Sequence, residues 1–139
     1  MNWLLDTCVI CEPTQARPSP RVLNWLREQP EETLHLSVLT LGEIRRGCSR
    51  LPAGPKRRAL EHWLDRDLAE RFAGRILPLD TPAADLWGRM LAGAEAKGRA
   101  LPTLDSLLAA TALAHGLSLV TRNVADFATT GAELFNPWE

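Results

Sequence analysis

The chain alternates between two patterns of apolar residues, one typical of strands and one typical of helices. Short apolar runs or two-residue alternation predict strands at residues 3–5, 33–38, 75–79 and 117–121. Between them, apolar residues recur every three or four positions, as on the buried face of an amphipathic helix. The helices expected from this spacing cover residues 19–29, 39–48, 60–72, 81–98 and 102–115, with a helical turn at 123–127 and an edge strand at 132–135.

Residues at the ends of these segments support the boundaries. Ser19 and Thr81 are good N-caps, and each is followed by a proline, which suits the first helical turn. Gly116 suits the left-handed position after a helix that ends near His115. Strands that alternate with helices indicate parallel strands, right-handed crossovers and helices on both faces of the sheet. We therefore expect an α/β fold formed by a single domain, residues 1–139.

The composition agrees with this expectation. The chain has 139 residues, of which 45% are hydrophobic, enough for one packed core. It contains no apolar run of the roughly 18 residues that a membrane span needs. Its first residues lack the basic start of a secretion signal, so we expect a cytoplasmic protein. The net charge of -1 argues against a protein that coats nucleic acid but is compatible with an enzyme that holds a few phosphates.

Positive charge is concentrated in one stretch of the chain. No acidic residue lies between Glu43 and Glu61, and this interval holds Arg45, Arg46, Arg50, Lys56, Arg57 and Arg58. Such a run is often only a solvated loop or helix face. The alternative is a phosphate-contacting rim beside Glu43, in which Arg45 and Arg46 touch an RNA backbone.

Cys8 and Cys11 have the C-x-x-C spacing of zinc and redox sites. Zinc needs two further ligands, and the rest of the chain offers only Cys48 and three scattered histidines. The intervening Val9 and Ile10 are typical of apolar packing. We therefore expect free thiols that are buried or half-buried.

Acidic residues occur near the ends of several predicted strands. Asp6 follows the first strand, and Glu43 lies about one turn into the helix after the second. Asp105 lies in the first turn of the helix before the fourth strand, and Asp126 comes just past that strand. Functional groups gather at the carboxyl ends of parallel strands. If the outer strands flank the first one, these four acids converge on one crevice.

Carboxylates that share a crevice repel each other and raise each other's pKa. A divalent cation removes the conflict, and all-oxygen ligands select Mg²⁺ or Mn²⁺. Such an ion can polarise a phosphate and activate water, so the pattern indicates phosphodiester hydrolysis. Each acid also has a purely structural alternative: an Asx turn, a solvated helix face, a helix dipole or a closing turn.

Several segments together resemble one protein family. Residues 4–10 (LLDTCVI) contain the first acid, residues 36–47 (LSVLTLGEIRRG) contain the second, and residues 105–127 begin with the third. These blocks resemble the PIN-domain toxins of bacterial type II toxin–antitoxin modules, the VapC family. Residues 72–80 (FAGRILPLD) and 135–138 (FNPW) resemble its FitB branch in particular.

The resemblance implies a three-layer α/β/α PIN-like fold with a central, mainly parallel sheet of four or five strands. It implies an endoribonuclease that depends on Mg²⁺ or Mn²⁺, cuts RNA and arrests growth. It also implies a cognate antitoxin that blocks the site, and a homodimer that often lies within a larger toxin–antitoxin assembly.

Family roles carry over residue by residue. Asp6 and Asp105 match metal ligands, and Glu43 matches the second acid, which binds the metal directly or through water. Thr121 matches a supporting hydroxyl position near the metal.

The fourth acidic position departs from the FitB pattern. In that branch an acid directly follows Thr-Arg, and here Asn123 occupies that place. Many VapC-like chains instead have the pattern T-R-N-x-x-D-F, in which Asp126 is the fourth acid. We expect Asp126 to take part in catalysis and Asn123 to orient a water or a neighbouring acid.

Other functions remain as alternatives. A Mg²⁺-dependent phosphatase of the haloacid dehalogenase type also has an aspartate after its first strand, but its D-x-D motif has Cys8 in the second place here. A nucleotide-binding module would need a G-x-G-x-x-G or Walker A loop, and the sequence has neither. A non-catalytic PIN-like interaction protein is the remaining alternative, and the four retained acids argue against it.

Overall fold

The computed structural model describes residues 1–139 and contains one five-stranded sheet. The strands are β1 (Trp3–Leu5), β2 (Leu34–Ser37), β3 (Ile76–Leu77), β4 (Ser118–Val120) and β5 (Leu134–Phe135). Their order is β3-β2-β1-β4-β5, and every neighbouring pair is parallel. The structure thus confirms the parallel sheet, the flanking of the first strand and the late edge strand.

Helices connect the strands largely as the periodicity predicts. The structure corrects the start of α6, because Asp80 rather than Thr81 is its N-cap, accepting a hydrogen bond from the Ala83 amide at 3.1 Å. The predicted helix over 60–72 begins at Pro55 and has a π-helical middle, Trp63–Leu68. The helices are α1 (Thr7–Cys11), α2 (Pro20–Glu28), α3 (Val38–Arg50), α4 (Pro55–His62), α5 (Ala69–Arg71), α6 (Thr81–Ala96), α7 (Thr103–Ala114) and α8 (Val124–Phe127), with 3-10 turns at Glu12–Thr14 and Glu31–Thr33.

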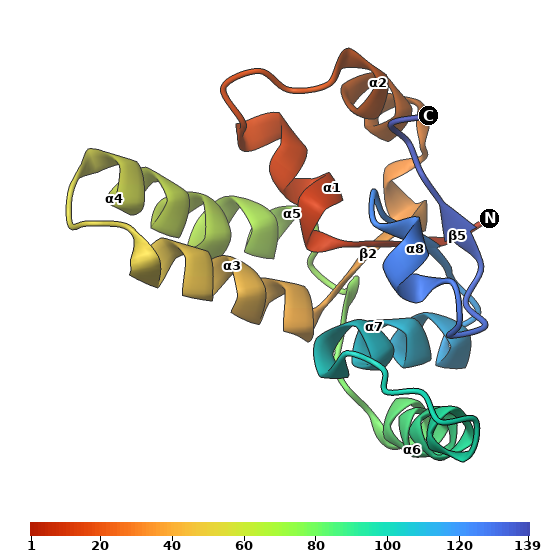
Figure 1. Ribbon diagram of the computed structural model, residues 1–139. Helices are drawn as coiled ribbons and strands as arrows, with labels where there is room; N and C mark the ends of the chain where they lie inside the picture. The colour runs from red at the N-terminus through yellow and green to blue at the C-terminus, as the bar shows by residue number, and fades with distance from the viewer.

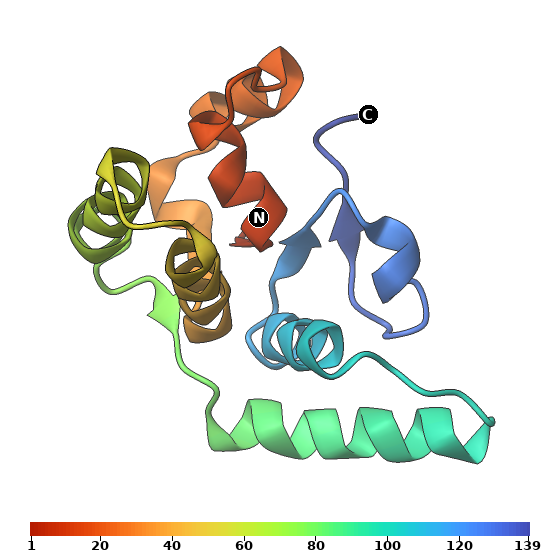
Figure 2. The same ribbon diagram turned by 60° about the vertical axis from the view of Figure 1, so that its left-hand side comes forward.

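The sheet lies between two layers of helices (Figures 1 and 2). Successive strand residues point to opposite faces, so Leu5 packs into one core cluster and Leu4 into another. The larger cluster joins the sheet to α1, α2, α3 and the π-helical segment, and the smaller one joins it to α7 and α8. Figure 2 shows α6 on the outer side of α7, where the Trp87 indole donates to Ser106 Oγ at 3.0 Å. These layers confirm the three-layer α/β/α fold.

None of the helices is both long and apolar enough to cross a bilayer.

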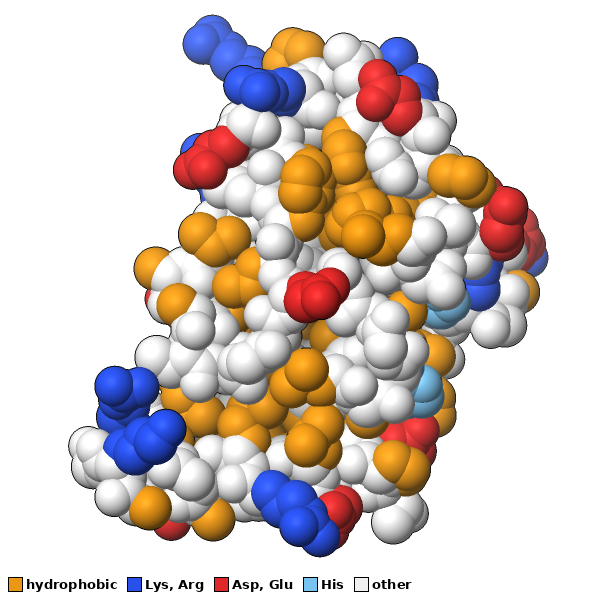
Figure 3. Space-filling view, turned by 90° about the vertical axis from the view of Figure 1, so that its right-hand side faces the viewer, with side chains coloured by type: hydrophobic (Ala, Val, Ile, Leu, Met, Phe, Trp, Pro, Cys, Tyr) orange, Lys and Arg blue, Asp and Glu red, His pale blue; other side chains and the backbone are white.

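An aromatic cluster covers the β5 edge of the sheet. The ring of Trp25 on α2 lies 5.1 Å from that of Trp3 and 5.3 Å from that of Phe135, measured between centroids. All three side chains are half-buried. Figure 3 views the molecule from the side of β5 and the chain ends, and hydrophobic side chains gather on that surface. The cluster attaches α2 to β5 and shields part of the apolar surface of this edge strand from solvent.

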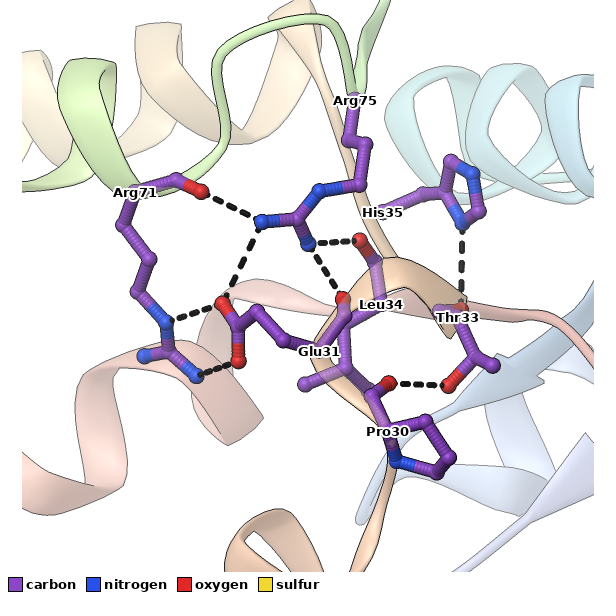
Figure 4. A network of polar contacts seen from close by, with 7 residues as sticks. All are labelled: Pro30, Glu31, Thr33, Leu34, His35, Arg71 and Arg75. Atoms are coloured by element: carbon purple, nitrogen blue, oxygen red, sulfur yellow. Dashed lines mark hydrogen bonds and ion pairs between the residues drawn. The ribbon is translucent and has the colours of Figure 1, made fainter.

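A polar network fixes the opposite edge, where β3 joins β2 (Figure 4). The guanidinium of Arg75 donates to the carbonyl oxygens of Glu31 and Leu34, both at 2.6 Å, and also to the Arg71 carbonyl. Arg71 binds the Glu31 carboxylate through two nitrogens, at 2.7 and 3.3 Å. Both arginines also lie over the ring of Phe72, 4.9 Å from its centroid. A two-residue strand is thereby held in register by side chains as well as by its own backbone.

We expect Arg75→Met to lower the free energy of unfolding by about 2 kcal/mol, because carbonyl oxygens lose a charged donor. Urea unfolding measures this loss. Arg89→Met is the matched control, since Arg89 is fully exposed and pairs only with Asp85. The control is expected to unfold like the wild type, and an equal loss in both variants would contradict the role of the network.

The same network predicts a pH dependence. Hydrogen bonding from Arg71 is the main cause that holds the pKa of Glu31 below its usual value. A lowered carboxyl pKa stabilises the folded state at pH above the ordinary value, and this contribution is lost as the pH falls through the lowered pKa. Glu31→Gln should therefore be less stable than wild type at neutral pH, and the difference should vanish in acid. Urea titrations across this range test it; a gap that does not change with pH would disprove the linkage.

Candidate active site

Asp6 lies at the carboxyl end of the central strand, and its carboxylate is fixed by three donors. Its backbone amide continues the pairing with β4 by donating to the Val120 carbonyl at 2.9 Å. Its Oδ1 accepts from the Thr7 amide at 2.8 Å and so caps α1. Its Oδ2 accepts from Thr121 Oγ1 at 2.7 Å and from the Cys8 thiol at 3.7 Å. Only 9% of Asp6 is exposed, so its charge is nearly buried and its orientation is set.

Glu43 projects from α3 toward the same place. Its Oε1 accepts a hydrogen bond from Thr7 Oγ1 at 2.7 Å, which links α3 to the start of α1. Burial raises the pKa of Glu43, and the negative charges of Asp6 and Asp105 raise it further. The carboxylate therefore lies within the electrostatic reach of both other acids. Thr7 is the residue that sequence reasoning missed, although it directly follows Asp6 in the block of residues 4–10.

Asp105 is half-buried in the first turn of α7. Burial is the main cause that raises the pKa of Asp105, and the charges of Asp6 and Asp126 add to it. Its carboxylate accepts no hydrogen bond from the protein, unlike those of Asp6 and Glu43. Asp105 thus presents free oxygens beside two other negative charges.

The two candidates for the fourth acidic position, Asn123 and Asp126, lie in the segment that runs from β4 into α8. The Asn123 amide donates to Thr121 Oγ1 at 3.0 Å, while its exposed side chain makes no hydrogen bond. Asp126 lies on α8, is exposed, and acts on Asp105 through its charge. The hydroxyl of Thr121 therefore connects the backbone of this segment to Asp6.

The donor set fits a hard divalent cation in its chemistry. Carboxylate oxygens are the ligands that Mg²⁺ and Mn²⁺ prefer, and a cation between these acids would offset the repulsion that raises two of their pKa values. In this structure no three Asp, Glu, His or Cys side chains come close enough together to ligate one ion. For three of these side chains to ligate one ion, the distances between their carboxylates would have to be shorter than in this structure.

The cysteines are free, as the sequence analysis predicts. Burial raises the pKa of Cys8 and of Cys11 to about 11, with the charge of Asp6 contributing at Cys8. Both thiols are therefore protonated near neutral pH and are poor metal ligands or nucleophiles.

The two candidate RNA-contacting arginines of α3 differ in their surroundings. Arg45 forms ion pairs with Asp65 and, at 3.6 Å, with Glu61, which attaches α3 to the neighbouring helical segment. Arg46 is exposed, has no ion-pair partner, and its positive charge lowers the pKa of Glu43. Of the two, Arg46 has the free guanidinium nearer the acids.

Comparisons with known proteins bear on the family and the fold of this chain. The family model described as PIN domain matches residues 3–132. The chain is 38% identical to VapC ribonuclease Y4jK of Sinorhizobium fredii, over 98% of this chain and 97% of that one. It is also 38% identical to toxin FitB of Neisseria gonorrhoeae, over 97% of each chain. The crystal structure of FitAcB from that organism superposes with a TM-score of 0.92 at 37% identity and covers 99% of both chains.

The family model, the relatives that match nearly the whole chain and the similar solved structure all agree with the family that the sequence blocks resemble. The chain therefore belongs to the PIN-domain family, in its group of VapC and FitB toxins.

Proposed function

We propose that this protein is an endoribonuclease that depends on Mg²⁺ or Mn²⁺ and acts as the toxin of a type II toxin–antitoxin system. The observation that carries the proposal is the group of mutually interacting carboxylates at the carboxyl edge of the parallel sheet, with Asp6 oriented by three donors. Relatives over nearly the whole chain are named ribonuclease and toxin. Its substrate is RNA, and its place of action is the cytoplasm.

In this mechanism Asp6 and Asp105 would hold the ion, and Glu43 would bind it directly or through water. When bound there, the ion would supply charge stabilisation at the phosphate and a more acidic water. Thr121 keeps Asp6 Oδ2 in place, and Thr7 keeps Glu43 Oε1 in place. The other oxygen of Glu43, Oε2, is left to accept a proton from the attacking water, and Asp126 helps to orient that water.

The proposal includes a cognate antitoxin that blocks the acids, and a homodimer within a larger assembly. The antitoxin is supported by two solved structures similar to this chain, which are of FitAB bound to an IR36 DNA fragment and of FitAcB from Neisseria gonorrhoeae. The uncompensated carboxylates also offer a natural target for a positively charged group of the antitoxin.

One observation favours a second candidate, a non-catalytic PIN-like interaction protein. No three side chains of suitable type are close enough to ligate an ion in this structure. The two candidates differ in whether divalent metal produces RNA cleavage. Release of fragments from an internally labelled single-stranded RNA, with Mg²⁺, Mn²⁺ or EDTA, separates them.

Asp6→Asn is expected to abolish metal-dependent cleavage and toxicity and to leave the fold intact. Asparagine keeps an oxygen for the α1 cap, and the Thr121 hydroxyl can rotate to accept from the new amide. Cleavage assays and thermal unfolding measure the two effects. Asp67→Asn, at an exposed position of the π-helical segment, is the matched control and should cleave normally. A fully active Asp6→Asn protein would refute the proposed site.

Thr7→Val is expected to lower kcat by about tenfold, because groups that orient a metal ligand typically contribute that much. Thr7→Ser keeps the hydroxyl that donates to Glu43 and should retain most of the activity. Single-turnover cleavage with saturating Mg²⁺ measures both variants. Equal activity of the Val and Ser variants would show that Thr7 does not position Glu43.

A further inference from the structure

An open hollow of about 560 Å³ lies beside α1, whose Cys8 and Cys11 form part of its lining. Cys8 forms one end of it, and the sulfur of Cys8 lies 3.7 Å from Asp6 Oδ2. Arg17 and Arg122 line the rest of the hollow together with Cys11, Glu12 and neighbouring loop residues. A group bound there would therefore lie next to the phosphate that the acids process.

The hollow carries more positive than negative charge, because two arginines and one acid line it. Arg17 and Arg122 are exposed, and neither guanidinium has an ion pair or a hydrogen bond within the protein, whereas Arg45, Arg71 and Arg75 all do. Glu12 is the one acid in the lining, and its Oε1 already accepts from the Ser19 amide at 3.0 Å. Two free guanidinium groups are suited to phosphate oxygens, which they bind in a planar, two-point arrangement.

The chain terminus holds one of these guanidinium groups in place. Arg122 Cζ lies 5.3 Å from the centroid of the Trp138 ring, within the range of a cation–π contact. The Trp138 amide donates to Asn136 Oδ1 at 2.9 Å, and the half-buried ring packs against the larger core cluster. The Asn-Pro-Trp turn therefore forms a rigid support for Arg122, which directly follows the residue that bonds to Asp6.

We propose that Arg122 and Arg17 bind backbone phosphates of single-stranded RNA next to the bond that is cut, and that Trp138 is a positioning residue for Arg122. This inference rests on the proposed function, because it assumes that the acids act on RNA. Charge complementarity selects a polyanion, and the 3.7 Å between Asp6 Oδ2 and the sulfur of Cys8, which lines the hollow, brings that polyanion next to Asp6. The C-terminal turn thus takes part in substrate binding through Arg122.

The first test measures RNA binding without cleavage. In the Asp6→Asn background, fluorescence anisotropy with a labelled single-stranded RNA gives Kd at several salt concentrations. Arg122→Ala and Arg17→Ala should each weaken binding about tenfold, and each should lower the slope of log K against log salt by about 0.7. Arg27→Ala is the matched control, since Arg27 is exposed and unpaired but lines a separate hollow beside Glu31 and Arg71; it should bind like the parent.

The second test addresses Trp138 through kinetics of the protein with intact acids. Trp138→Leu keeps an apolar side chain but loses the ring face, so KM should rise about threefold with kcat unchanged. Trp138→Phe keeps a ring face and should restore the wild-type KM. Thermal unfolding of both variants is the control for folding. A loss of kcat in both variants with no separate change in KM would show a merely structural role and overturn the positioning assignment.

The possible outcomes distinguish a failure of this inference from a failure of the proposed function on which it rests. If wild-type protein cleaves RNA with metal but Arg122→Ala and Arg17→Ala keep the parent Kd and salt slope, the RNA subsite is wrong and the nuclease remains. If wild-type protein cleaves no RNA with either metal, the proposed function itself fails. Arg122→Lys refines the result, because it should keep the salt slope while losing part of the affinity that depends on stacking.

Discussion

A nearly buried carboxylate at the end of the central strand sets the conditions for the rest of this structure. A buried charge is costly unless polar groups surround it, and Asp6 receives a backbone amide, a hydroxyl and a thiol. All three donors are neutral, so the negative charge is held in place without being cancelled. Its field reaches Glu43 and Asp105, where it adds to the effect of burial and raises the pKa values of both acids. The fold thus maintains a local excess of negative charge that a divalent cation or a cationic partner group can relieve.

The arginines divide into two groups around this negative centre. Arg71 and Arg75 close the β3 edge by binding Glu31 and backbone carbonyls. Arg45 likewise joins α3 to the π-helical segment, which supports the helix that carries Glu43. These groups are committed to the fold, and removing them would loosen elements far from the chemistry. The guanidinium groups of Arg46 and Arg122 remain free near the acids and are available to a polyanion.

Sequence reasoning predicted the strands and long helices because each shows its own period over enough residues. It missed α1, since the five residues Thr7–Cys11 are too few to show a helical repeat. It missed the role of Thr7 for a different reason, because the hydroxyl acquires a role only when α3 brings Glu43 to 2.7 Å. Arg45 and Arg46 are adjacent in sequence. Because α3 turns their side chains in different directions, Arg45 is ion-paired and Arg46 is free. The acids were identified by their places at strand ends, whereas the contacts that orient them depend on tertiary packing.

At the fourth acidic position, three residues along the chain decide which neighbouring group a carboxylate affects. The Asn123 amide is bonded to Thr121 Oγ1, the same hydroxyl that donates to Asp6. This bond uses the backbone N–H of Asn123, so the exposed side chain at that position contributes no charge to the site. Placing the acid at Asp126 instead moves it into α8, and the carboxyl group whose pKa its charge raises is that of Asp105. Negative charge is thereby spread toward α7, while the cation of Arg122 directly follows the residue that bonds to Asp6. If the acids act on RNA as proposed, this distribution favours a strand that reaches them beside Arg122.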